Sequence, residues 1–186
     1  MSASLVVTPL GPGPGSGPAL VRRNPVGDAR GSFARLFCRD ELAAFGWTGP
    51  VAQVNYSRTL KAGTIRGFHY QRAPHAEMKL VTCLRGAVHD VAVDIRPDSP
   101  RRHDHVAAEL SAENGCAMLI PEGFAHGFQA FTDDVELLYL HSVPYAPSAA
   151  AGLRPDDPAL AIEWPLGISL LSDRDASWPL LRAEEV

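Results

Sequence analysis

The stretch Val88-His89-Asp90-Val91-Ala92-Val93-Asp94-Ile95 partly alternates apolar and polar side chains, which is typical of a half-buried β-strand. Turn residues flank it on both sides. The same scheme of short β-like segments between turns continues along the chain after Gly31. About nine strands with little helix favour an all-β sandwich or barrel. They are expected at residues 33–38, 51–60, 64–71, 79–84, 87–95, 105–110, 116–120, 125–131 and 135–142.

The two ends of the chain depart from this pattern. A first strand is expected at residues 5–10, and the Gly/Pro run at 11–18 predicts a flexible loop, so that residues 1–20 form one strand-plus-loop unit. A short helical turn is expected from Asp40 to Gly46. The proline-rich segment 147–186 reads as an irregular tail with one short helix. A length of 186 residues predicts one domain spanning 1–186.

The composition excludes several classes of protein. Hydrophobic residues make up 46% of the chain and charged residues 20%, which indicates a folded soluble protein. The net charge of -4 gives no reason to expect nucleic-acid binding. No apolar run approaches the length of a membrane span, and no secretory signal is recognisable. Three widely spaced cysteines predict free thiols and a cytoplasmic location.

Two short strings carry the chemistry. Arg66-Gly67-Phe68-His69-Tyr70-Gln71 is followed by Lys79, and Pro121-Glu122-Gly123-Phe124-Ala125-His126 comes later in the chain. A base, a cation and a second imidazole on neighbouring strands suit the removal of a proton next to a carbonyl. They suit a metal less well, because an amide at Gln71 is a weak ligand and two histidines fall short of the usual three protein ligands.

These strings resemble the paired motifs of the cupin superfamily, Gly-x5-His-x-Gln from Gly63 and Gly-x5-Pro-x-Gly-x2-His from Gly115. Further strings in a fixed order make the chain similar to the dTDP-4-dehydrorhamnose 3,5-epimerase family over about residues 20–182. That family includes 3- and 5-epimerases of antibiotic deoxysugar pathways. The resemblance implies a cupin-type jelly-roll β-barrel or sandwich with short peripheral helices. The strings lie at 27–31, 53–55, 66–71, 79–81, 90–96, 110–114, 121–128 and 162–165.

The resemblance also implies a reaction that needs no cofactor and no metal. The expected substrate is a dTDP-linked 4-keto-6-deoxysugar, which is inverted at C3 and/or C5 through an enolate. His69 matches the base, and Asp175 matches the carboxylate that orients it. Tyr139 matches the proton donor on the opposite face, and Lys79 is expected to meet the C4 oxyanion.

The substrate-binding residues implied by the family surround this set. Arg30 and Arg66 match arginines suited to the diphosphate, and Tyr145 matches an aromatic that stacks on thymine. His126 is expected beside the sugar. A homodimer is expected, in which an N-terminal strand crosses to the partner and residues near Arg30 complete its site. The remaining predicted substrate contacts are Gln53, Asn55, Arg35 and Arg174.

Some positions differ from the family pattern. Arg35 stands in place of a substrate-contacting glutamate, Arg174 in place of a lysine, and prolines occupy two aromatic positions, Pro144 and Pro155. These changes concern the identity of the sugar more than the chemistry.

Two alternatives stay open at this point. One is a metal-dependent cupin oxygenase or isomerase that uses His69, His126 and Glu77, and the other is a non-catalytic sugar-nucleotide-binding cupin. The sequence does not decide between inversion at one carbon and at two, nor does it name the pathway.

Overall fold

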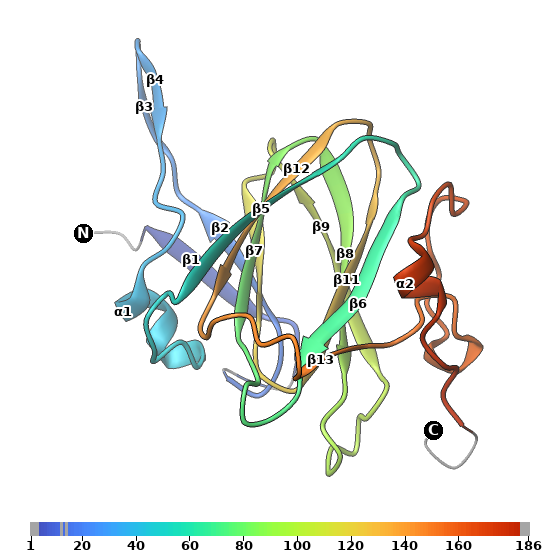
Figure 1. Ribbon diagram of the computed structural model, residues 1–186. Helices are drawn as coiled ribbons and strands as arrows, with labels where there is room; N and C mark the ends of the chain where they lie inside the picture. Colours follow the sequence, from blue (N-terminus) through green and yellow to red (C-terminus); the bar gives the residue numbers. More distant parts are fainter. Residues whose placement is uncertain (1–3, 12, 14, 183–186) are drawn as a thin grey trace.

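Two antiparallel sheets face each other in the computed structural model, which describes residues 4–11, 13 and 15–182 (Figure 1). The six-stranded sheet runs in the order β1 (Leu5–Pro9), β2 (Ala19–Arg23), β10 (Cys116–Ile120), β7 (Lys79–Arg85), β12 (Val135–His141) and β5 (Gln53–Thr59). The five-stranded sheet runs β13 (Ala150–Gly152), β6 (Ile65–Gln71), β11 (Phe124–Ala130), β8 (Ala87–Asp94) and β9 (His105–Ser111). The predicted all-β, cupin-type architecture is confirmed.

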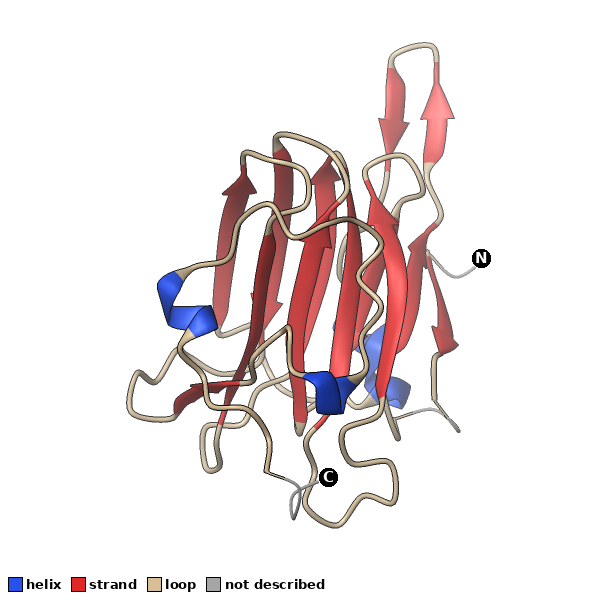
Figure 2. Ribbon diagram, turned by 90° about the vertical axis from the view of Figure 1, so that its right-hand side faces the viewer, coloured by secondary structure: helices blue, strands red, loops and turns tan. Residues whose placement is uncertain are grey.

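The helices are short and lie outside the sheets, as Figure 2 shows. They are α1 (Arg39–Leu42), the 3-10 turns η1 (Ala43–Phe45) and η2 (Pro158–Leu160), and α2 (Asp173–Ala176). The expected turn before Gly46 is confirmed, and Gly46 ends it at φ 100°, a left-handed conformation that favours glycine. No helix in the described ranges is long and apolar enough to cross a membrane.

A small hairpin, β3 (Val26–Asp28) and β4 (Gly31–Phe33), projects away from both sheets (Figure 1). The strand predicted at 33–38 is therefore wrong except for its first residue. Residues 34–38 run as irregular chain from the hairpin to α1, and Phe37 packs edge-on against buried Trp47. An apolar run of this length can fill a core gap without pairing to a strand, which periodicity alone does not distinguish.

The N-terminal boundary also needs correction. Ala19 and Leu20 do not belong to a loop, because they begin β2, which pairs with β1 on one side and β10 on the other. Over residues 147–182 the tail is broadly irregular, as expected, and contains the predicted short helix, whereas residues 183–186 of that prediction lie outside the described residues. The tail also adds β13 to the edge of β6. Gly152 allows this close approach, since a Cβ there would lie 2.5 Å from the backbone carbonyl oxygen of Phe68 on β6.

The interior between the sheets changes character along its length. The inward positions of β12 are Val135 and Leu137 at one end, both fully buried, and Tyr139 and His141 at the other. Because side chains two residues apart share a face of a strand, all four point into the same interior. The apolar end forms the main core, and the polar end opens into a cavity.

Candidate active site

A cavity of about 790 Å³ lies between the two sheets, and the tail closes part of its rim. The five-stranded sheet contributes residues of β6 and β11, and the six-stranded sheet contributes β5, β7 and β12. The tail adds the segment that carries α2. The polar lining residues are Gln53, Asn55, Tyr56, Ser57, Thr64, Arg66, His69, Tyr70, Gln71, Glu77, Lys79, His126, Tyr139, His141, Tyr145, Ser172, Arg174 and Asp175.

His69 and Asp175 form a close pair at one wall. The Nε2 atom of His69 lies 2.6 Å from Oδ1 of Asp175, and the backbone N–H of Gly67 donates to Oδ2 at 3.3 Å. Burial works against the charge of Asp175, but the hydrogen bond and charge of His69 outweigh it and hold the pKa of that carboxyl below its usual range. An ionised Asp175 keeps the ring proton on Nε2, so the lone pair of a neutral His69 lies on Nδ1.

The local backbone delivers both partners. The hydroxyl of Ser172 caps α2 by accepting from the N–H of Asp175, which places that carboxylate, only 4% exposed, beside Nε2 of His69. The His69 side chain remains 42% exposed to the cavity. A carboxylate from residue 175 and a histidine from residue 69 therefore meet only because the tail packs along β6.

Tyr139 approaches the cavity from the opposite sheet. Its hydroxyl lies 3.1 Å from the hydroxyl of Ser57 on the neighbouring strand β5. Burial is the main cause that raises the pKa of Tyr139, so the phenol keeps its proton at neutral pH. His69 on β6 and Tyr139 on β12 thus line one cavity from two facing sheets.

His126 lies directly opposite His69 in the register of β11 and β6, so the two motif strings do fall on neighbouring strands. Its Nε2 atom is 2.7 Å from Oδ1 of Asp90, and the His126 side chain is only 6% exposed. Its ring stands edge-on to Tyr139 at 6.1 Å between centroids. Asp90 was not anticipated from the sequence, although its place in the alternating strand 88–95 puts it on the inner face.

Lys79 is buried and bridges the two sheets. Its ammonium group lies 3.1 Å from Oε1 of Glu77 and donates to the backbone carbonyl of His69 at 3.0 Å. Glu77 also contacts Nδ1 of His141 through Oε2 at 2.8 Å. Glu77 is therefore held by a lysine and a third histidine and does not join His69 and His126. In the described part of the chain, no group of three or more histidine, cysteine or carboxylate side chains is arranged to hold a metal ion.

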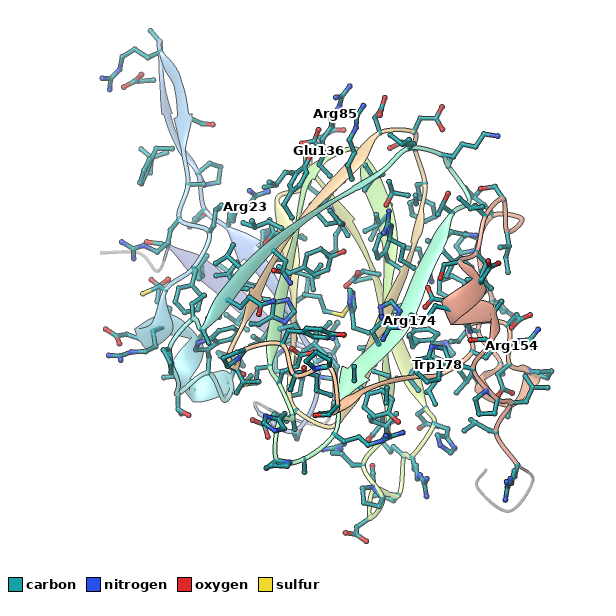
Figure 3. All side chains as sticks on the ribbon, viewed as in Figure 1. Arg23, Arg85, Glu136, Arg154, Arg174 and Trp178 are labelled. Atoms are coloured by element: carbon teal, nitrogen blue, oxygen red, sulfur yellow. The ribbon has the colours of Figure 1, made fainter. Side chains whose placement is uncertain are left out.

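Six of the predicted substrate contacts line the cavity, and two do not. Arg66 donates to the hydroxyl of Thr59 at 3.0 Å, and the guanidinium of Arg174 lies 5.9 Å from the ring of Trp178 (Figure 3). Arg30 lies at the turn of the projecting hairpin, paired with Asp28, and Arg35 lies near Glu41. Neither arginine reaches this chain's own cavity. The six that line it are Gln53, Asn55, Arg66, His126, Tyr145 and Arg174.

Two polar cavity residues that sequence reasoning missed are Ser57 and His141. His141 stands two positions after Tyr139 and Ser57 stands two after Asn55, so each shares a strand face with a residue that was singled out. That period of two was the available signal.

The fold and the cavity define a cupin-type enzyme with an oriented histidine and a half-buried phenol on facing walls. A family model described as dTDP-4-dehydrorhamnose 3,5-epimerase matches residues 16–183. A dTDP-4-dehydrorhamnose 3,5-epimerase of Sinorhizobium fredii is 42% identical over 167 residues, covering 87% of this chain and 84% of that protein. The chain belongs to the dTDP-4-dehydrorhamnose 3,5-epimerase family.

Solved structures agree with this assignment. The Legionella pneumophila 3,5-epimerase in complex with dTDP-4-keto-L-rhamnose superposes with a TM-score of 0.83 at 37% identity, covering 91% of this chain and 92% of that one. A 3′-monoepimerase of Streptomyces bikiniensis in complex with dTDP-quinovose superposes with a TM-score of 0.81 at 38% identity, covering 90% of this chain and 86% of that one. The family therefore includes enzymes described as inverting one carbon and as inverting two.

Proposed function

We propose that this protein epimerises a dTDP-linked 4-keto-6-deoxyhexose at C3 and/or C5, with His69 as the base and Tyr139 as the acid. The observation that carries the proposal is the approach of these two side chains from facing sheets into one cavity. A base on one side of a pyranose ring and an acid on the other is the arrangement that inversion at a carbon requires.

In the proposed reaction, Nδ1 of His69 takes the proton from the carbon next to the C4 ketone. The C–H electron pair forms the enolate, and its negative charge develops on the C4 oxygen. Lys79 is the buried cation proposed to face this oxygen. Tyr139 then donates its proton to the opposite face of the carbon. Exchange with solvent removes the proton from His69 and restores the phenol of Tyr139, so the reaction needs no redox partner.

Nucleotide recognition is proposed at the rim of the cavity. Arg66 and Arg174 supply guanidinium groups suited to diphosphate oxygens. Tyr145 is 54% exposed at the rim, as expected for a ring that is free to stack on a thymine base. The amides of Gln53 and Asn55 line the wall below it.

A homodimer is proposed because of the projecting hairpin. A two-stranded hairpin is marginally stable by itself, and Val26 and Phe33 on this one are 74% and 78% exposed. The edge strand β5 also exposes Val54 and Tyr56, each at 57%. Packing the hairpin against a second copy would cover such surfaces and bring Arg30 to the neighbouring cavity. A cytoplasmic location is proposed on the three free thiols, Cys38, Cys83 and Cys116.

The direct test is solvent exchange with dTDP-4-keto-6-deoxyglucose in D₂O, followed by NMR. Deuterium at C3 and C5 is expected of a 3,5-epimerase, and deuterium at C3 alone of a monoepimerase. Folded protein that introduces deuterium at neither carbon, yet binds the nucleotide sugar tightly, would reject the proposed reaction in favour of a binding protein. A stoichiometric transition metal in the purified protein would revive the metal-dependent alternative.

A further inference from the structure

A directed chain of hydrogen bonds runs along the wall of the cavity that faces His69. It begins at the backbone N–H of Tyr145, which donates to Oε1 of Gln53 at 2.9 Å. The amide nitrogen of Gln53 donates to Oδ1 of Asn55 at 3.1 Å. The amide nitrogen of Asn55 lies 3.3 Å from Nε2 of His141. Two neighbouring strands, β5 and β12, and the loop at Tyr145 thus place these polar groups in sequence.

The direction of this chain follows from its first member. A backbone N–H can only donate, so Gln53 must present its oxygen to Tyr145 and its NH₂ group to Asn55. Asn55 must then present its oxygen to Gln53 and its NH₂ group to the histidine. Nε2 of His141 is therefore an acceptor without a proton. Reversing either amide would place two donors or two acceptors face to face.

The chain continues from the other nitrogen of the same ring. With Nε2 unprotonated, the proton of a neutral His141 lies on Nδ1 and is donated to Oε2 of Glu77 at 2.8 Å. Oε1 of Glu77 receives the ammonium of Lys79 at 3.1 Å, and Lys79 also donates to the backbone carbonyl of His69 at 3.0 Å. Burial opposes the charge of Glu77, but the hydrogen bond from His141 and the charge and hydrogen bond of Lys79 hold the pKa of that carboxyl below its usual range.

The cross-strand register supports this continuity. His141 on β12 is paired with Gln53 on β5 and with Lys79 on β7, so the ring stands between the two halves of the chain. The His141 side chain is 11% exposed, and those of Glu77 and Lys79 are 9% and 7%. Hydrogen bonds among side chains this well buried are poorly replaced by water, so losing one link is costly.

We propose that neutral His141, with its proton on Nδ1, is a positioning residue that couples the nucleotide-binding rim at Tyr145 to the buried Lys79 beside the catalytic histidine. The inference rests on the proposed function. The Nε2 side of His141 holds the amides of Gln53 and Asn55, and through them the Tyr145 segment, in place. The Nδ1 side of His141 holds Glu77 and with it the ammonium of Lys79. If His141 had only a structural role, there would be no reason for its Nε2 side to affect binding of the nucleotide sugar and its Nδ1 side to affect the exchange reaction.

Two replacements separate the two sides. His141→Asn places an amide near the position of Nδ1 and keeps the contact with Glu77, and His141→Gln places one near Nε2 and keeps the contact with Asn55. We expect His141→Asn to weaken binding of the unreactive probe dTDP-glucose about five- to tenfold, the loss of one hydrogen bond, while exchange at saturating substrate stays within about twofold. We expect His141→Gln to lower exchange at saturating substrate about five- to tenfold, while binding of dTDP-glucose stays within about twofold. Equal losses of both quantities in both variants would overturn the proposal.

The wild-type protein provides a test that needs no variant. NMR correlations between the ring nitrogens and carbon-bound hydrogens of His141 identify the tautomer at neutral pH, and the proton is expected on Nδ1. A proton on Nε2 would overturn the inference whatever the ligand. An Nδ1 proton in a protein that does not bind dTDP-glucose would support the hydrogen-bond chain and count against the proposed substrate, so the two failures are distinguishable.

Discussion

Two histidine–carboxylate pairs lie side by side in this molecule, with nearly the same distance from Nε2 to Oδ1 but different surroundings. His69 and Asp175 are 2.6 Å apart, and His126 and Asp90 are 2.7 Å apart. The first histidine is 42% exposed to the cavity, whereas the second is 6% exposed. Access to a ligand, rather than the pairing itself, distinguishes a proposed base from a residue that holds the wall together.

The carboxylates differ in the same way. Asp175 comes from the irregular tail, and its second oxygen accepts from the backbone of Gly67. Asp90 comes from the middle of β8 and is fully buried, and its second oxygen has no hydrogen-bond partner among the described residues. Asp90 therefore relies on His126 for its hydrogen bond, whereas Asp175 is also held by the backbone of Gly67. The first pair is open to a ligand in the cavity, and the second is enclosed by the packing of the wall.

The largest expected effect comes from breaking each pair with the same substitution. His69→Asn should lower deuterium exchange about 10³–10⁴-fold, because the base is lost, with a small change in stability. His126→Asn should cost about 1–3 kcal/mol of unfolding free energy, because the shorter side chain leaves the buried carboxyl of Asp90 without its hydrogen-bond partner. Exchange assays and urea denaturation of both variants measure this contrast. Equal losses of activity and stability in the two would contradict it.

Removing the phenol tests the wall opposite His69. Tyr139→Phe should lower formation of the inverted product about 10²-fold while the variant still removes the substrate proton through His69. Product analysis and loss of label from C3-deuterated substrate, measured together, separate these steps. Because burial raises the pKa of Tyr139, ionisation of this phenol should cause no loss of wild-type activity below pH 10. Equal loss of both steps would argue against separate acid and base.

The smallest expected effect is an acid dependence of stability at Asp175. Its pKa is lowered on folding, so its ionised form stabilises the protein above the ordinary carboxyl value of about 4, and this contribution is lost as pH falls through the folded value. At pH 7 the free energy of unfolding of the wild type should exceed that of Asp175→Asn by about 1–2 kcal/mol, and this difference should shrink toward pH 3. Urea denaturation across that range is the measurement, and a gap that does not change with pH would exclude a charged Asp175.

Much of the fold follows from local pattern. The predicted strands at 64–71, 79–84, 87–95 and 116–120 match β6, β7, β8 and β10 to within one residue at each end. Those segments are buried on at least one face and bounded by turn residues, so the hydrophobic pattern and the turn residues indicate the same strand boundaries. The wrong strand at 33–38 and the unanticipated β13 are short segments whose conformation depends on what they pack against.

The sequence by itself determined the strands of the two sheets except β2 and β13, the two histidine strings and, through family resemblance, the set of His69, Tyr139, Asp175 and Lys79, whose roles stay predictions. Only the tertiary structure decided which other residues pair with one another around the cavity. His141 with Glu77 and Asp90 with His126 are separated by 64 and 36 positions along the chain. Such pairs meet only when sheet register is fixed, and a slip of one residue would turn each side chain to the other face.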